Sequence, residues 1–180
     1  MIHKIFEIRA LLKSDDRSSF HSGNIDLDRF FQRFAGQNQF RHHIGTNYVA
    51  ILENQITGFV TISSGEMATE FLQSAIKRRL PNYPLPVLRM ARLAVDKNFQ
   101  GAGLGKRLLK TVLMLALEMR ERYGCVGVVV DAKPEAVRFY SSFGFMKLEL
   151  ISGELGDRPQ PVSMFIPVGL IDKCVKNASQ

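Results

Sequence analysis

The stretch that decides the fold is Arg92-Leu-Ala-Val-Asp-Lys-Asn-Phe-Gln-Gly-Ala-Gly-Leu-Gly-Lys-Arg107, where a strand-like segment runs through a glycine-rich turn into a helix. Glycines at positions 101, 103 and 105 let main-chain N–H groups approach an anion closely. The start of the following helix adds its positive dipole end to these donors. The stretch therefore predicts a loop that binds a diphosphate.

Two other phosphate-binding patterns fit this loop poorly. A dinucleotide-binding GxGxxG pattern needs glycine where Lys106 stands. A P-loop needs glycine at position 100 and Ser or Thr at position 107, but the chain has Gln100 and Arg107 there. On these residues alone, an ordinary glycine-rich turn that caps a helix stays an alternative.

The rest of the chain alternates between strand and helix patterns. The apolar spacing predicts strands over 2–12, 48–52, 56–62, 87–95, 126–130, 145–151 and 162–168, and helices over 27–34, 69–80, 104–123 and 134–143. This order predicts an α/β fold: a mixed, mostly antiparallel sheet of six to seven strands with helices on both faces. We expect a single domain over residues 1–168, followed by a basic, disordered tail over residues 169–180.

Composition narrows the class of protein further. The N-terminal 19 residues mix charged and apolar side chains, which excludes a signal peptide or spanning helix there and favours a cytoplasmic protein without a membrane partner. The net charge of +7 favours polyanionic partners. Cys125 and Cys174 stand far apart and the pair His42-His43 has no third ligand at a suitable spacing, so no metal site is predicted.

Two motifs resemble those of one enzyme family. Gln100, Gly103 and Gly105 fit the pattern Q/R-x-x-G-x-G/A, which resembles the coenzyme A signature of the GNAT acetyltransferases. Downstream, Ala136-Val-Arg-Phe-Tyr-Ser-Ser-Phe-Gly-Phe145 is similar to the closing motif of that family, A-x-x-F-Y-x-x-x-G-F. Two matches in this order favour a GNAT fold over a plain glycine-rich turn.

This resemblance implies acetyl-CoA as the co-substrate and Tyr140 as the catalytic residue. The tyrosine hydroxyl would hydrogen-bond or protonate the leaving thiolate. No residue stands out as a general base: Glu66, Glu70 and Asp96 are conceivable, but we interpret each as a solvated carboxylate. The residues that the family likeness implies for the donor are Leu93, Ala94, Val95, Gln100, Gly101, Gly103, Leu104, Gly105, Lys106, Ala132 and Phe139.

A narrower resemblance concerns the acceptor. The stretch Phe20-x-Ser-Gly-Asn-x-x-Leu-Asp-Arg-Phe-Phe31, with Gly58-Phe-Val-Thr-Ile62 and the segment 86–95, resembles the GNAT toxins of bacterial toxin–antitoxin pairs. That family acetylates the α-amine of the amino acid on charged tRNA, which stops translation, and a ribbon-helix-helix antitoxin neutralises it. The resemblance also implies a homodimer.

Two windows without acidic residues support a nucleic acid partner independently. They lie between Asp28 and Glu53 and between Glu70 and Asp96, and basic windows of this kind suit phosphate backbones. One alternative is an acetyltransferase for a small-molecule amine or a protein N-terminus, and another is a nucleic-acid-binding or antitoxin-partner protein that keeps coenzyme A only as a ligand. The residues expected to bind tRNA are Arg29, Arg33, Lys77, Arg78, Arg79, Arg89 and Arg92.

Overall fold

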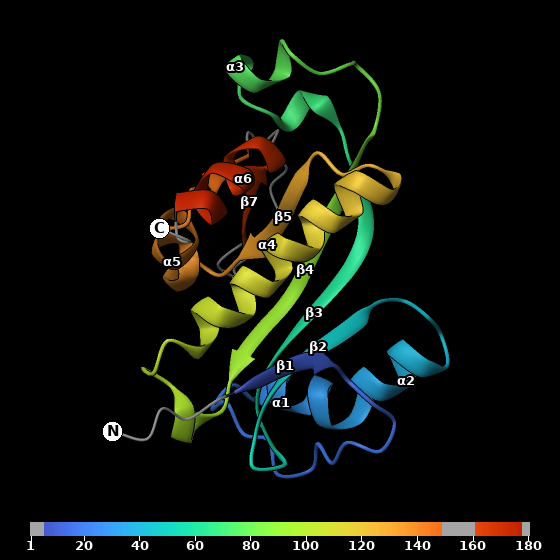
Figure 1. Ribbon diagram of the computed structural model, residues 1–180, viewed down its shortest axis with the longest axis vertical. Helices are drawn as coiled ribbons and strands as arrows, with labels where there is room; N and C mark the ends of the chain where they lie inside the picture. Colours follow the sequence, from blue (N-terminus) through green and yellow to red (C-terminus); the bar gives the residue numbers. More distant parts are fainter. Residues whose placement is uncertain (1–5, 149–160, 178–180) are drawn as a thin grey trace, which may run out of the picture. The chain divides into compact units, whose positions relative to one another are not determined.

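The computed structural model describes residues 6–148 and 161–177 of the 180-residue chain. They fall into two compact units, one built from 6–63 and 90–114, the other from 64–89, 115–148 and 161–177. The strands are β1 (Glu7–Ala10), β2 (Thr46–Leu52), β3 (Gln55–Met67), β4 (Leu85–Val95), β5 (Gly127–Ala132), β6 (Met146–Lys147) and β7 (Val162–Pro167). Their order in the sheet, β1-β2-β3-β4-β5-β7-β6, confirms the expected mixed sheet (Figure 1).

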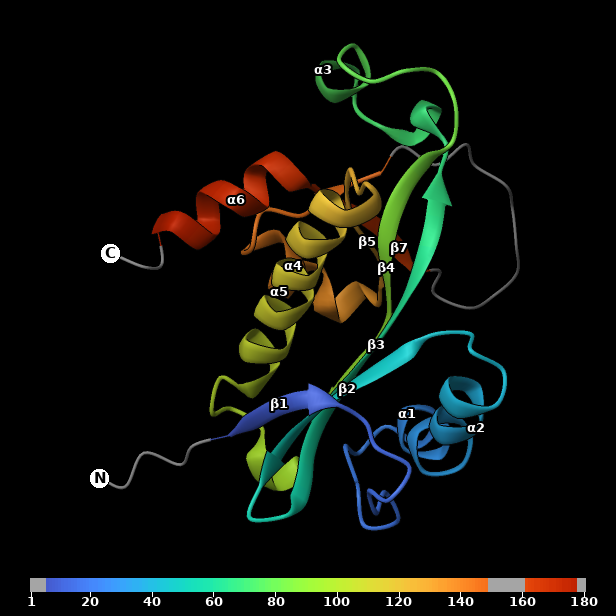
Figure 2. The ribbon, with the colours of Figure 1, turned by 45° about the vertical axis from the view of Figure 1, so that its right-hand side comes forward.

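In the first unit, helices cover both faces of the strands. β1 pairs antiparallel with β2, and β2 with β3. On one side lie α1 (Ile25–Arg29), the π-helical η1 (Phe30–Phe34) and α2 (Ala35–Phe40), where the ring of Phe31 stacks on that of Phe59 at 4.1 Å (Figure 2). Gly58 points to the other side, where an added Cβ would lie 3.0 Å from Leu108 of α4 (Leu104–Tyr123). Successive strand residues face opposite ways, so this unit confirms helices on both faces.

A buried carboxylate fixes the segment that leads into α1. Asp28 is only 6% exposed, and its carboxylate accepts the main-chain N–H of Ser22 at 2.8 Å and the Ser22 hydroxyl at 2.6 Å. His21 Nδ1 lies 2.8 Å from the second carboxylate oxygen. Burial raises the pKa of Asp28, but these hydrogen bonds outweigh burial and the net pKa is lowered. The chain turns at Gly23, with φ of 89°, and Asn24 then caps α1 through the Leu27 N–H at 3.1 Å.

The second unit is built around an antiparallel pair. β5 pairs with β7 over its whole length, and β6 adds to the other side of β7. A Cβ at Gly127 would overlap the carbonyl oxygen of Ile166, so only glycine fits at the start of β5. The helices are η2 (Thr69–Phe71), α3 (Ser74–Lys77), η4 (Pro134–Ala136), α5 (Val137–Ser141) and α6 (Val168–Asn177). A buried cluster of this unit consists of Met67, Leu72, Leu85, Val87, Val129 and Phe165.

Two expected elements differ from the structure in the segment 56–83. β3 continues to Met67 instead of ending at residue 62, because the polar residues that follow still alternate in exposure along the strand. The helix expected over 69–80 is only the two short pieces η2 and α3. Thr69 Oγ1 donates to the carbonyl oxygens of Pro81 at 3.0 Å and Tyr83 at 3.3 Å, which ties this connection into a compact loop.

The expectation of a disordered tail over 169–180 is wrong for residues 169–177, which belong to α6. Ile171 is fully buried, and Leu170 lies 3.0 Å from the Cβ that would be added at Gly144. Apolar packing therefore stabilises this helix, although its lysines made the segment look like a polar tail in the sequence. Parts of the strands expected over 2–12 and 145–151, and the tail beyond residue 177, lie outside the described residues.

Candidate active site

The glycine loop of the first unit joins β4 to α4. After Val95 the chain makes the short 3-10 helix η3 (Lys97–Phe99), and α4 begins at Leu104. Gly101 and Gly103 have φ angles of 79° and 78°, a left-handed conformation that favours glycine. A Cβ added at either residue would meet nothing within 4 Å. The loop thus needs glycine for its backbone conformation, and the space above it is open to a ligand.

Gln100 fixes this loop by its side chain. Its amide Nε2 donates to the carbonyl oxygen of Val95 at 2.9 Å and to that of Ser22 at 2.9 Å. The sequence places Gln100 among the donor-binding residues, whereas in the structure its amide ties together the end of β4 and the segment before α1. We infer that the family pattern requires Gln here to shape the loop.

Asp96 also connects the end of β4 to the segment before α1. Our interpretation of Asp96 as a solvated carboxylate is wrong. It is 2% exposed, and its oxygens accept the N–H of His21 at 3.0 Å and of Asn98 at 3.0 Å. Asp96 therefore caps η3 and fixes residue 21, while Glu66 and Glu70 are exposed.

The other donor-binding residues of the first unit contribute in two ways. Ala94 and Leu104 are buried, so their side chains belong to the core and only their main chains are available to a ligand. Leu93, Val95 and Gly105 are half-buried, and Lys106 is exposed. The N–H groups of the first turn of α4 have no carbonyl partner inside the helix. Together with Lys106 they form a positively charged, donor-rich surface that suits a diphosphate.

The second unit carries Tyr140 on α5. It is 6% exposed, and its ring packs edge-on against Phe139 at 5.1 Å and Phe145 at 5.6 Å. Burial raises the pKa of Tyr140 to about 12, so the phenol is neutral in ordinary buffers. Phe139 is half-buried, and Ala132 is buried at the end of β5.

We expect the buried phenol to make the protein sensitive to alkali. The folded-state pKa lies about 2 units above the usual value of 10.0, so the stabilisation is complete below pH 10 and is lost as pH rises toward 12. Two pKa units correspond to about 3 kcal/mol. Urea unfolding at about pH 9 and about pH 11.5 measures this loss, and Tyr140→Phe should show a smaller loss than the natural protein. An equal loss in both proteins would contradict the assignment.

The basic residues expected at a tRNA surface differ in their surroundings. Arg29 and Arg33 are exposed in the first unit, and Lys77, Arg78 and Arg79 are exposed in the second. Arg92 is half-buried with its guanidinium 3.7 Å from the centre of the Phe30 ring, and burial lowers its pKa. Arg89 forms an ion pair with Asp131 at 3.0 Å. Arg92 and Arg89 therefore already have intramolecular partners.

The described residues contain no cluster of three or more His, Cys, Asp or Glu side chains able to hold a metal ion. Cys125 is buried, and its thiol donates to the Gly127 carbonyl oxygen at 3.2 Å, as expected for a core cysteine. The side chain of Cys174 lies outside the described residues. In the part of the chain that the structure describes, no helix is long and apolar enough to cross a membrane.

A glycine loop with left-handed residues after β4, a buried tyrosine in an F-Y motif and a seven-stranded mixed sheet are typical of an acetyltransferase of the GNAT type. Residues 43–147 match the family model described as an acetyltransferase (GNAT) domain, and the chain belongs to this family. It is 32% identical over 139 residues to a tRNA-acetylating toxin of Mycobacterium tuberculosis, a match that spans 76% of this chain and 82% of that protein.

Two solved structures show the same fold. The toxin AtaT complexed with acetyl-methionyl-tRNAfMet is similar with a TM-score of 0.82 and 22% identity, over 95% of this chain and 99% of that one. A mutant of AtaT bound to the C-terminus of the antitoxin AtaR and acetyl-CoA is similar with a TM-score of 0.75 and 22% identity, over 96% and 99% of the two chains.

Proposed function

We propose that this protein is a toxin of a toxin–antitoxin pair, an acetyl-CoA-dependent N-acetyltransferase that modifies the α-amine of the amino acid on charged tRNA and so blocks translation. The observation that carries the proposal is the 32% identity to a tRNA-acetylating toxin across 76% of the chain. The open glycine loop supports it, as does the buried phenol of Tyr140.

The loop residues fit the donor. Main-chain N–H groups over residues 101–106 would bind the diphosphate, and the exposed Lys106 and Arg107 would add positive charge beside it. When bound, acetyl-CoA supplies the acetyl group as a thioester. Gln100 and Asp96 hold the loop in place before the donor arrives.

Tyr140 acts mainly as a hydrogen-bond donor to the leaving sulfur. Its pKa of about 12 lies about 3.5 units above that of a free thiol, near 8.5, so complete proton transfer would cost about 5 kcal/mol. A neutral phenol in an apolar setting still stabilises a developing thiolate, because charge-assisted hydrogen bonds are strong where water is excluded.

The lack of a strong base among the candidate carboxylates supports an acceptor amine of low basicity. Asp96 is engaged in capping, and Glu66 and Glu70 are exposed. An α-amine next to an ester is less basic than a lysine side chain, so more of it is neutral and nucleophilic at neutral pH. Exposed arginines and lysines in both basic windows would bind the tRNA phosphates.

The decisive experiment is incubation of the purified protein with radiolabelled acetyl-CoA and total aminoacyl-tRNA. We expect label in the RNA fraction that mild base releases, and no label on deacylated tRNA. Label on a small amine or a peptide N-terminus, with none on charged tRNA, would instead support the alternative acetyltransferase. Binding of acetyl-CoA without any transfer would support a binding protein.

Neutralising two exposed arginines tests the tRNA surface. Arg78→Gln/Arg79→Gln should weaken activity on charged tRNA and lower the salt dependence of tRNA binding by roughly 1.4 to 1.8 in slope, since each lost phosphate contact removes about 0.7 to 0.9. The affinity for acetyl-CoA should not change. Lys110→Gln, an exposed lysine of α4 outside both basic windows, is the matched control. An unchanged slope in the double variant would defeat the idea.

We further propose that a ribbon-helix-helix antitoxin neutralises the protein, that the toxin works in the cytoplasm, where charged tRNA is found, and that it forms a homodimer. The related AtaT toxin bound to the C-terminus of the antitoxin AtaR supports pairing with an antitoxin, whatever the antitoxin's fold. Sedimentation of the purified protein tests the dimer. Growth arrest on expression, relieved by co-expression of a ribbon-helix-helix antitoxin, tests the pairing.

A further inference from the structure

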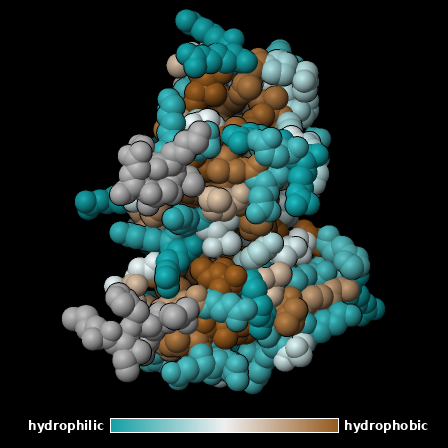
Figure 3. Space-filling model, in the orientation of Figure 1, coloured by the Kyte–Doolittle hydropathy of each residue, from teal (hydrophilic) through white to brown (hydrophobic). Residues whose placement is uncertain are grey.

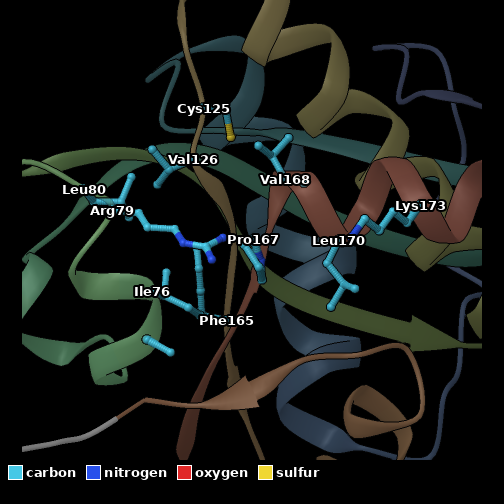
Figure 4. A pocket seen from close by; sticks show the side chains of 12 residues that line it. Ile76, Arg79, Leu80, Cys125, Val126, Phe165, Pro167, Val168, Leu170 and Lys173 are labelled. Carbon is cyan, nitrogen blue, oxygen red and sulfur yellow. The ribbon is translucent and has the colours of Figure 1, made fainter.

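The second unit contains a pocket that shares only Arg79 with the residues proposed to take part in acetyl transfer. Its volume is about 550 Å³, within the range of small-molecule sites, roughly 300 to 1,000 Å³. It lies where α3, the start of β5, the end of β7 and the first turn of α6 meet (Figure 4), and its lining includes neither a residue of the glycine loop nor the rings of Phe139 and Phe145 that pack on Tyr140. The apolar part of its wall consists of Ile76, Leu80, Val126, Phe165, Val168 and Leu170.

This apolar wall is open to the surface. Figure 3 shows hydrophobic surface gathered between α3 and α6, in a surrounding of hydrophilic residues. Gly169 at the start of α6 leaves further room, because a Cβ added there would meet nothing within 4 Å. A concave apolar surface of this size, rimmed by polar groups, is typical of a site that a ligand fills.

Positive charge converges on the same pocket. Arg79 and Lys173 line it, both are exposed, and Figure 4 shows the two side chains reaching toward it from opposite sides. No acidic residue is among the described residues that line it. The first turn of α6 also faces the pocket through Val168, Gly169 and Leu170. The Val168 N–H is taken by the Val126 carbonyl oxygen, but the N–H groups that follow it in the first turn have no carbonyl partner inside the helix, and a helix start carries a partial positive charge. Two cations and a helix start therefore favour one anionic group.

We propose that this pocket binds a small amphiphilic anion: an apolar chain or ring seated against Phe165 and Val126, with a single carboxylate or sulfonate held by Arg79, Lys173 and the start of α6. A neutral apolar ligand would make no ion pair with Arg79 or Lys173, and a highly charged ligand would not bind favourably to the apolar wall. The junction of α6 with β5 supports a fixed site, because the Val168 N–H donates to the Val126 carbonyl oxygen at 2.9 Å. The inference does not depend on the identity of the acetyl acceptor.

The test uses the full-length protein with decanoate and decanol as a matched pair of ligands that differ in charge. The fluorescent anion 1-anilinonaphthalene-8-sulfonate reports binding. We expect one saturable dye site per chain, displaced by decanoate at a concentration at least tenfold lower than by decanol, since one charge-assisted hydrogen bond is worth about a factor of ten. Equal displacement by the two ligands, or no saturable site, would overturn the proposal.

Variants then locate the site. Arg79→Gln/Lys173→Gln should weaken decanoate about tenfold or more and leave decanol unchanged, while Lys77→Gln, an exposed lysine of α3 that does not line the pocket, should change neither. Gly169→Phe should fill the opening and abolish dye binding, whereas Gly169→Ala should preserve it. Circular dichroism checks that each variant folds. If Gly169→Phe does not fold, the Arg79→Gln/Lys173→Gln variant still tests the proposal.

Three results would refute the assignment. Undiminished decanoate binding in the double variant would exclude the cations, and undiminished dye binding in a folded Gly169→Phe protein would exclude the pocket. The third result combines two observations: the natural protein binds no ligand, and the Gly169→Phe protein forms a smaller oligomer than the natural protein. It would show that a second copy of the chain fills this surface instead.

Discussion

Tyr140→Phe is expected to lower kcat for acetyl transfer by about two to four orders of magnitude and to leave the Kd for acetyl-CoA within about twofold. The change removes one hydroxyl and keeps the ring that packs against Phe139 and Phe145. Because the phenol donates to the sulfur only as negative charge develops there, its loss should appear in the chemical step and not in binding.

Single-turnover kinetics with saturating acetyl-CoA, together with calorimetry of acetyl-CoA binding, separate these two effects. Tyr123→Phe is the matched control, since Tyr123 is 75% exposed at the end of α4. The raised pKa of the buried Tyr140 phenol also predicts that ionisation of this residue causes no loss of activity below about pH 11. Full turnover by the Tyr140→Phe protein would remove Tyr140 from the mechanism.

Gly103→Val is expected to weaken acetyl-CoA binding by at least tenfold. A β-branched residue is strained at a φ of 78° by about 1 to 2 kcal/mol or more, so the loop must change conformation and its N–H groups lose their common direction. Space is not the cause, because nothing lies within 4 Å of the added Cβ.

Ala102→Val is the matched control for this prediction. It introduces the same side chain one residue earlier, at an exposed position that is not among the positive-φ residues, and it should bind acetyl-CoA almost normally. Isothermal titration of both variants with acetyl-CoA makes the comparison. If both variants bind equally well, the loop conformation does not control donor binding.

The fold could be predicted because its signals are local. The glycine spacing before α4, the all-apolar run of β5 and the long apolar repeat of α4 each depend on neighbours within a few residues. The same locality led to the error at β3, whose polar residues 63–66 look like a loop until pairing is considered. Local pattern also hid α6, whose helical conformation depends on the burial of Ile171.

The site could be predicted less completely, because its support comes from distant parts of the chain. Asp96 is buried and accepts a hydrogen bond from the N–H of His21, 75 residues earlier, so its carboxylate is structural although Lys97 and Asn98 follow it in the sequence. Arg89 and Arg92 are engaged by Asp131 and Phe30, which no spacing rule connects to them. Which charged groups are available to a ligand is therefore decided by tertiary contacts.

The bond from Gln100 to the Ser22 carbonyl, 78 residues away, limits how the protein can be shortened. A fragment cut at residue 43, where the family match begins, would retain the glycine loop and the F-Y motif. It would nevertheless lose the Ser22 carbonyl oxygen, which accepts from Gln100, and the His21 N–H, which donates to Asp96. Such a fragment should contain both sequence motifs of the family and still fail to bind acetyl-CoA.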